Sequence, residues 1–138
     1  MGFEPTWFGV DGMDGILTLE GFDTSLAEGV IVLTPYSADD SSELNQAFVK
    51  AYKEKTGEIP NQFAADAYDC IMAMYQAINK AGITSAMKDD EICTKMVETF
   101  TSMTYDGLTG ANMTWGTDGT VSKSPNAVVI QNGAYVGM

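Results

Sequence analysis

The chain has 138 residues, of which 45% are hydrophobic and 19% charged, a composition typical of one soluble folded domain. Its 19 acidic residues outweigh seven lysines, the net charge is −12, and there is no arginine and no histidine. So acidic a chain repels phosphates and anionic lipid headgroups, which argues against nucleic-acid and membrane-surface binding. Without histidine, Ser-His-Asp and Cys-His catalysis and histidine-ligated metals are excluded; without arginine, bidentate phosphate clamps are excluded.

The two cysteines, Cys70 and Cys93, match neither a metal-binding motif nor a disulfide scaffold. Both fall in apolar segments, where a cysteine acts as a small buried hydrophobe, and a bridge between them is the alternative. No apolar run approaches the roughly 20 residues of a membrane span. The first residues carry no basic or apolar signal region, so we expect an excised fragment of a longer chain.

In chain order, the first elements expected are short strands. Residues 7–10 form an apolar run that ends in the acidic, glycine-rich turn 11–15. Residues 30–33 form a continuous aliphatic run without polar alternation. Such runs are typical of strands covered on both faces, as in parallel α/β sheets.

Helical patterns follow these strands. Asp40 is a suitable N-cap, with Glu43 placed to complete a capping box, and Gly57 and Pro60 end the first helix. A second helix ends at Gly82, and a third begins near 89–91, where acidic residues suit the positive end of the helix dipole. The second helix has the strongest apolar stripe, of the kind that covers a sheet in a complete α/β fold. This stripe consists of Ala64, Ala67, Tyr68, Ile71, Met74, Tyr75 and Ile78.

Hairpins are expected after residue 105. Residues 112–115 and 120–121 flank a first turn, and a second turn at Asn132-Gly133 lies between residues 127–130 and 134–136. Asn-Gly suits a type I′ turn because both central positions need positive φ. The order of elements predicts an α/β fold with few interior strands for its helices to cover.

The turn 11–15 is the candidate binding site. It lacks the ligand spacing of an EF-hand and the glycine and lysine pattern of a phosphate loop. A carboxylate on a glycine-rich loop past a strand's C-terminal end lies where open α/β sheets bind ligands. Asp11 is therefore a candidate partner for a cationic group such as an α-ammonium, and a solvated turn is the alternative. Asp66 and Asp69 have the spacing of paired catalytic carboxylates, but a solvated helix face is the favoured interpretation.

Several stretches of the sequence are similar to those of a known family, in the same order and spacing along the chain. They are FGVDG at 8–12, AEGVIV and PY within 27–36, AYKEKTG and PNQFAADAYD within 51–69, and YDGLTG, WGTDG and AVVI within 105–130. Together they resemble the C-terminal portion of ABC-transporter solute-binding proteins of the branched-chain amino-acid-binding (Leu/Ile/Val-binding, type I periplasmic) family.

The resemblance implies a partial periplasmic-binding-protein fold, in which Rossmann-like α/β lobes are joined by hinge strands. This chain would cover about the last third of such a protein. By this analogy, residues 1–36 are the end of the second-lobe sheet and a hinge crossing. Residues 37–104 are helices that pack on the first lobe, and residues 105–138 are the C-terminal hairpins and the hinge return.

The resemblance also implies site residues. Asp11 occupies the place where family members hold the ligand's α-ammonium, and Gly12 lies beside it. Phe63 lies near a position of apolar ligand contact. The usual holders of the ligand carboxylate belong to the absent first-lobe segments.

The implied function is capture of a small amino acid, branched-chain or otherwise apolar, outside the cytoplasm, in the periplasm or on a cell-surface lipoprotein. The partners would be the membrane permease subunits of an ABC importer. The family does no chemistry on its ligand, so we expect no enzyme activity, no cofactor and no metal. The alternatives are a ligand-sensing receptor domain of the same fold and a fragment without binding activity of its own.

The expected absence of neighbouring strands predicts the oligomeric state of the isolated chain. The strand at 30–33 and the apolar helix stripe would lack partners, which leaves open strand edges and exposed apolar surface. We therefore expect self-association into a small closed homo-oligomer.

Overall fold

The computed structural model describes residues 2 and 4–138, which form two compact units of a mixed α/β fragment. The first unit contains the residues up to Ala65 and those from Ser124 onward, and the second contains Asp66–Lys123. Helix α2 (Gln62–Ala81) begins in the first unit and continues in the second.

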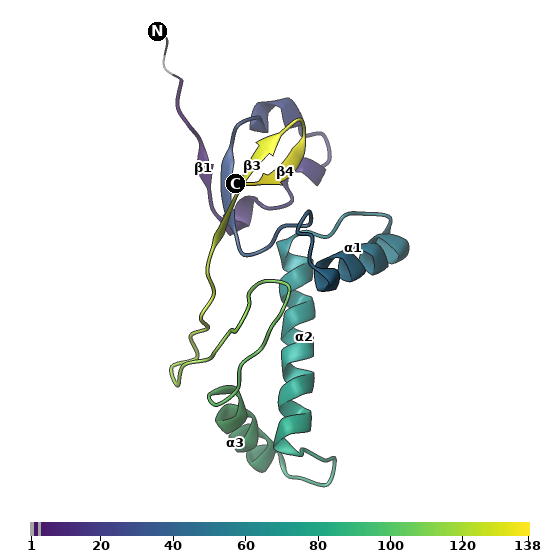
Figure 1. Ribbon diagram of the computed structural model, residues 1–138, viewed down its shortest axis with the longest axis vertical. Coiled ribbons are helices and arrows are strands. Elements are labelled where there is room, and N and C mark those ends of the chain that lie inside the picture. The colour runs from purple at the N-terminus through teal and green to yellow at the C-terminus, as the bar shows by residue number, and fades with distance from the viewer. Residues whose placement is uncertain (1, 3) are drawn as a thin grey trace. The chain divides into compact units, whose positions relative to one another are not determined.

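Within the described residues, the first unit is built on a four-stranded sheet of order β1-β2-β3-β4 (Figure 1). β1 (Phe8–Gly9) pairs in parallel with β2 (Ile31–Thr34). β2 pairs antiparallel with β3 (Asn126–Gln131), and β3 forms a hairpin with β4 (Ala134–Gly137). The sheet is therefore mixed rather than wholly parallel. Short 3-10 helices connect β1 to β2, at Asp11–Met13, Ile16–Thr18 and Thr24–Ala27.

Strand β2 departs from the expectation for residues 30–33. Val32 and Thr34 are buried, whereas Ile31 and Leu33 are half-buried, so one face is fully covered and the other partly. Both edges of β2 have a partner strand. The prediction that this strand lacks neighbours is therefore wrong, because β3 arrives from the far end of the sequence to occupy one edge.

The C-terminal hairpin confirms the turn prediction. Asn132 and Gly133 have φ of 52° and 72°, as a type I′ turn requires. The hairpin brings two buried side chains of β3 onto the core of the first unit. That core consists of Ala27, Val30, Val32, Val128 and Ile130.

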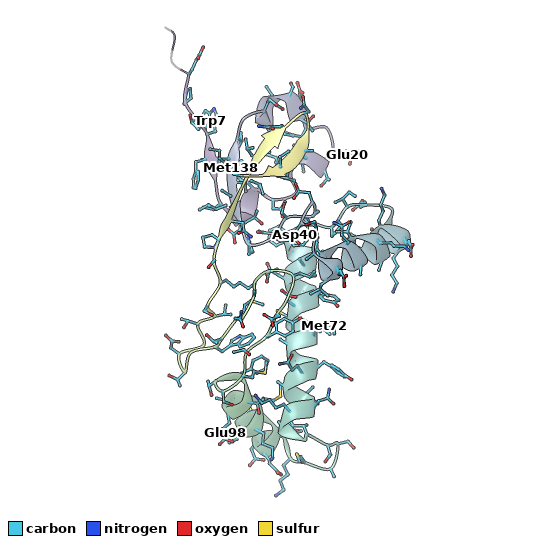
Figure 2. The ribbon with its side chains drawn as sticks, in the orientation of Figure 1. Trp7, Glu20, Asp40, Met72, Glu98 and Met138 are labelled. Atoms are coloured by element: carbon cyan, nitrogen blue, oxygen red, sulfur yellow. The ribbon has the colours of Figure 1, made fainter. Side chains whose placement is uncertain are left out.

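Helix α1 (Glu43–Thr56) begins two residues later than the capping prediction implies. Ser42 is the N-cap, and its hydroxyl accepts a hydrogen bond from the amide of Asn45 (3.4 Å). The carboxylate of Asp40, labelled ahead of α1 in Figure 2, instead accepts from the amide of Ser42 (2.9 Å). Both residue types cap helices well, so sequence alone does not separate them. The helix ends at Gly57 as predicted.

Helix α2 ends before Gly82 as predicted, but it buries the face opposite the predicted stripe. Ile71, Tyr75 and Ile78 are 65%, 63% and 39% exposed, so the stripe is uncovered in this chain, as expected for a helix without its sheet. The small and polar residues of the other face are buried instead, because loops and helix α3 approach them closely. The buried residues of α2 are Gln62, Ala65, Asp69, Ala73 and Ala77.

The second unit contains α3 (Asp89–Phe100), which starts where predicted and lies beside the C-terminal half of α2 (Figure 1). Its core consists of Ala73, Ala77, Met103, Tyr105 and Met113. The first predicted hairpin is reduced to a single bridge between Trp115 and Val121, without strands on either side.

The cysteines and the helix lengths complete the description of the fold. Cys70 and Cys93 are free and exposed, so the expectation of buried cysteines is wrong. Both lie on the solvent side of helices whose other faces form the core of the second unit. Within the described residues, no helix is long and apolar enough to cross a membrane.

Candidate functional site

Asp11 lies just past β1, at the start of the 3-10 turn Asp11–Met13. The predicted placement of a carboxylate beyond a strand end is therefore present in the first unit. The side chain is exposed, and its Oδ1 accepts a hydrogen bond from the amide of Gly12 (3.0 Å). A carboxylate has about four acceptor positions, so most of its capacity faces solvent.

Gln62 holds this loop from the first turn of α2. Its side chain is 1% exposed. Nε2 donates a hydrogen bond to the carbonyl oxygen of Asp11 (2.8 Å), and Oε1 accepts one from the hydroxyl of Thr34 on β2 (2.9 Å). One buried amide therefore connects a strand, the acidic loop and the helix start.

Asp14 closes the loop onto the same helix end. Its Oδ2 accepts a hydrogen bond from the backbone amide of Gln62 (2.6 Å), and its Oδ1 accepts one from the amide of Gly15 (2.9 Å). The first amides of a helix have no partner within it, and a carboxylate there is also favoured by the helix dipole. Gly15 has φ of 89°, a conformation that glycine adopts without strain.

Phe63 follows Gln62 in the chain and is 50% exposed. The preceding residue, Asn61, caps the helix, since its Oδ1 accepts a hydrogen bond from the amide of Ala64 (3.1 Å). Gln62 is joined to Phe63 by a peptide bond and to Asp11 by a hydrogen bond. Gln62 thus links the loop that carries Asp11 and Gly12 to the helix start that carries Phe63.

Two tyrosines of the first unit lie near Asp14. The phenol oxygen of Tyr135 accepts a hydrogen bond from the amide of Gly15 (3.0 Å). Burial raises the pKa of Tyr135, and the nearby charge of Asp14 raises it further. Burial likewise raises the pKa of Tyr36, with further contributions from the charges of Asp14 and Asp40. Both phenols therefore stay protonated at neutral pH and add no charge beside the loop.

A cavity of about 470 Å³ also opens within the first unit. Asp14, Thr34, Tyr36, Tyr52 and Tyr135 are among the residues that line it, whereas Asp11, Gly12 and Phe63 are not. Those three predicted residues are all exposed. In this chain they lie at the solvent-exposed surface rather than in the cavity.

The second pair of carboxylates serves structure. Asp69 is 5% exposed and accepts hydrogen bonds from the amides of Leu108 and Thr109 (2.9 and 2.8 Å), so a solvated position is wrong for it. Asp66 forms an ion pair with Lys123 (2.7 Å). The described residues contain no group of three or more side chains placed to hold a metal ion.

Sequence reasoning missed Gln62 and Asp14 as members of this site. One signal was available: two polar amides, Asn61 and Gln62, follow Pro60 at a helix start, where unpaired backbone amides need acceptors. That signal predicts capping. It does not indicate which loop the second amide reaches.

The sequence profile of the periplasmic binding protein family matches residues 8–134. The chain therefore belongs to the periplasmic binding protein family, whose members are solute-binding proteins. The resemblance found in the sequence is confirmed at the level of the family. A search of curated protein sequences finds no match.

Solved structures of the same fold agree with this assignment. The leucine-binding protein LivK from Thermotoga maritima superposes with a TM-score of 0.76 at 24% identity, over 99% of this chain and 37% of that chain. The substrate-binding protein LivJ from Streptococcus pneumoniae, in complex with isoleucine, gives 0.76 at 24% identity, over 98% and 36%. A solute-binding protein from Rhodopseudomonas palustris BisB5, in complex with 3,4-dihydroxybenzoic acid, gives 0.68 at 24% identity, over 91% and 33%. This chain thus spans about a third of the length of these relatives.

Proposed function

We propose that this chain is the part of an amino-acid-binding protein that holds the ligand's ammonium group. The observation that carries the proposal is the exposed carboxylate of Asp11 on a loop that Gln62 and Asp14 hold in place. An ammonium group provides the charge and the donors that such a carboxylate accepts. Phe63, next in the chain to Gln62, supplies exposed apolar surface, and Gly12, with open space around its α-carbon, lets a ligand approach the backbone.

The chemistry of the site favours an amino acid over the other ligands named among structural relatives. LivJ was crystallised with isoleucine, whereas the Rhodopseudomonas palustris protein holds an aromatic acid that has no ammonium group. A free carboxylate repels such an acid and attracts an amino acid. We therefore expect a branched-chain or other apolar amino acid, bound without chemical change.

In the complete protein, we infer that the opposite lobe closes over the Asp11 loop and that the loaded protein delivers its ligand to ABC permease subunits. The protein would work outside the cytoplasm, in the periplasm or as a cell-surface lipoprotein. Because Asp11 and Phe63 are exposed here, the chain of 138 residues supplies one wall of the site. We expect this chain alone to bind the ligand weakly.

The proposal is tested by Asp11→Asn in the full-length protein, with calorimetry against leucine, isoleucine, valine and 3,4-dihydroxybenzoic acid. Loss of a charge contact in a closed cleft costs about 2–5 kcal/mol, so amino-acid binding should weaken at least about 30-fold. Glu20→Gln is the matched control, since Glu20 is an exposed carboxylate of the same unit (Figure 2). Binding by Asp11→Asn within about threefold of wild type, a difference under about 1 kcal/mol, would remove Asp11 from the site.

Self-association of the isolated chain stays a prediction, and its basis is now the uncovered face of α2. Ile71 and Tyr75 are large apolar residues exposed on that face. Burying them between two copies would remove apolar area from water. Light scattering at several concentrations tests this, with Ile71→Lys expected to shift the chain toward monomer. A concentration-independent monomer would contradict the prediction.

A further inference from the structure

Two hydrogen bonds of opposite direction join Gln62 to the loop that carries Asp11. Gln62 donates its side-chain amide to the backbone of the loop, and Asp14 of the loop accepts the backbone amide of Gln62. We propose that Gln62, together with Asp14, is a positioning residue that sets the direction of the Asp11 carboxylate. This inference rests on the proposed function, because it concerns the same ammonium contact.

The orientation of the Gln62 amide is fixed by its partners. Oε1 lies 2.9 Å from the hydroxyl oxygen of Thr34, and Nε2 lies 2.8 Å from the carbonyl oxygen of Asp11. A carbonyl oxygen needs a donor, so a flipped amide would place two acceptors against each other. Because the side chain is buried, water cannot replace the lost bond without cost.

The hydrogen bond from Gln62 acts on the Asp11 carboxylate through a single peptide unit. The carbonyl oxygen of Asp11 accepts from Gln62 and from the amide of Asp14 (2.9 Å), which occupies both of its lone pairs. The other end of that peptide is the amide of Gly12, which donates to Oδ1 of Asp11 itself (3.0 Å). A peptide unit is planar, so fixing its carbonyl also fixes its N–H. Gln62 thereby orients the donor that holds the Asp11 carboxylate.

The chemical consequence is a carboxylate that is ordered before the ligand arrives. Immobilising a loop and a charged side chain on binding costs free energy, and preorganisation removes part of that cost. Without the donor from Gln62, only the amide of Asp14 holds the carbonyl oxygen of Asp11, and the Asp11–Gly12 peptide rotates more freely. Asp11 then has to be ordered at the expense of ligand affinity.

The test compares Gln62→Met, Gln62→Glu and Asn45→Leu in the full-length protein. Methionine has a similar length without donor or acceptor, and glutamate keeps an acceptor for Thr34 but loses the donor to Asp11. Asn45 is the matched control. It is a buried amide of the same unit, 2% exposed, and it donates to the carbonyls of Ala38 and Asp40 rather than to the acidic loop.

Two measurements are made on each variant: hydrogen exchange of the segment 10–15 and calorimetric affinity for leucine, isoleucine and valine. Both Gln62 variants should speed exchange of this segment and weaken affinity about tenfold, as expected for one lost hydrogen bond. Asn45→Leu should lower thermal stability while leaving both measurements at their wild-type values.

Two results would overturn the inference. The first would leave the proposed function standing, and the second would reject it as well. If the Gln62 variants exchange and bind like wild type while Asp11→Asn weakens binding, the positioning role is rejected and the proposed function stands. If the Gln62 variants loosen the segment but neither they nor Asp11→Asn change affinity, the ammonium contact is rejected, and the positioning role falls with it.

Discussion

Loops 11–15 and 106–110 are both acidic, both contain glycine, and both are held by a buried polar side chain of α2. In the first loop the helix contributes a neutral amide: Gln62 donates to the carbonyl oxygen of Asp11 (2.8 Å). The carboxylate of Asp11 stays exposed. The helix therefore fixes the backbone of this loop and leaves its charge free.

In the second loop the polarity is reversed, because the helix contributes the charge. Asp69 accepts hydrogen bonds from the amides of Leu108 and Thr109, and the hydroxyl of Thr109 donates to it as well (2.7 Å). The hydroxyl of Tyr105 lies 3.4 Å from the same carboxylate. The difference between the loops teaches that burial and satisfied acceptors mark a structural acid, whereas an exposed acid on a braced loop is available to a ligand.

The largest effect expected from this comparison is that of Asp69→Ala. The variant leaves the amide and hydroxyl of Thr109 buried without an acceptor, and such donors cost about 1–3 kcal/mol each. We expect a loss of about 3–5 kcal/mol in the free energy of unfolding, measured by denaturant titration. Asp66→Ala, which removes a partly exposed ion pair, should cost less than about 1 kcal/mol. Equal losses in the two variants would contradict the structural role of Asp69.

The next largest difference in the free energy of unfolding is expected between alanine variants of a glycine in each loop. A Cβ added at Gly107 would lie 2.5 Å from the carboxylate oxygens of Asp69, whereas one added at Gly12 meets nothing within 4 Å. Forced crowding of this kind costs about 1–3 kcal/mol. Gly107→Ala should therefore lower the free energy of unfolding by that amount, while Gly12→Ala stays within about 0.5 kcal/mol of wild type. An unchanged free energy of unfolding in Gly107→Ala would mean that the Asp69 side chain moves aside easily.

A smaller effect is expected at alkaline pH, where both loops have a tyrosine beside an acid. Burial raises the pKa of Tyr105, and the charge of Asp69 raises it further; burial and Asp14 act in the same way on Tyr135. The unfolded chain ionises these phenols near their ordinary pKa of 10.0, while the folded chain retains the protons. Stability should therefore be complete below pH 10 and fall above it, as measured by thermal unfolding and tyrosinate absorbance.

The matching variant for this pH effect is Tyr105→Phe. It removes one of the titrating groups, so its stability should fall less steeply above pH 10 than that of wild type. An unchanged slope would show that Tyr105 does not contribute to the alkaline loss.

The smallest effect on stability is expected for Asp11→Asn. Its carboxylate is exposed, and its hydrogen bond to the amide of Gly12 is retained by an asparagine oxygen. The free energy of unfolding should stay within about 0.5 kcal/mol of wild type, although ligand affinity falls. A large loss of stability would place Asp11 with Asp69 as a structural acid.

Local signals in the sequence predicted local structure well. Glycine after α1 and α2 marked both helix ends, Asn132-Gly133 marked the hairpin, and the acids at 89–91 marked the start of α3. The position of Asp11 past a strand end followed from the same kind of signal. Each of these features depends on a few neighbouring residues.

Contacts between distant parts of the chain could not be predicted. The pairing of Ile31 with Val129 depends on how the whole first unit closes. The covered face of α2 was mispredicted because Gln62 and Asp69 look like solvent-facing residues until their loop partners are known. Likewise, the residues next to Asp14 in the sequence do not indicate that its carboxylate reaches the start of α2.

The pairing of charges has a consequence for the medium in which this protein folds. Of seven lysines, only Lys123 forms an ion pair in the described part of the chain, against a formal net charge of −12. Compaction therefore brings unneutralised anions together, and that repulsion opposes folding. Dissolved cations shorten the range of such repulsion to about 10 Å at 0.1 M salt. The folded state should accordingly gain stability from moderate salt, and its surface carries a diffuse layer of counterions in place of fixed internal neutralisation.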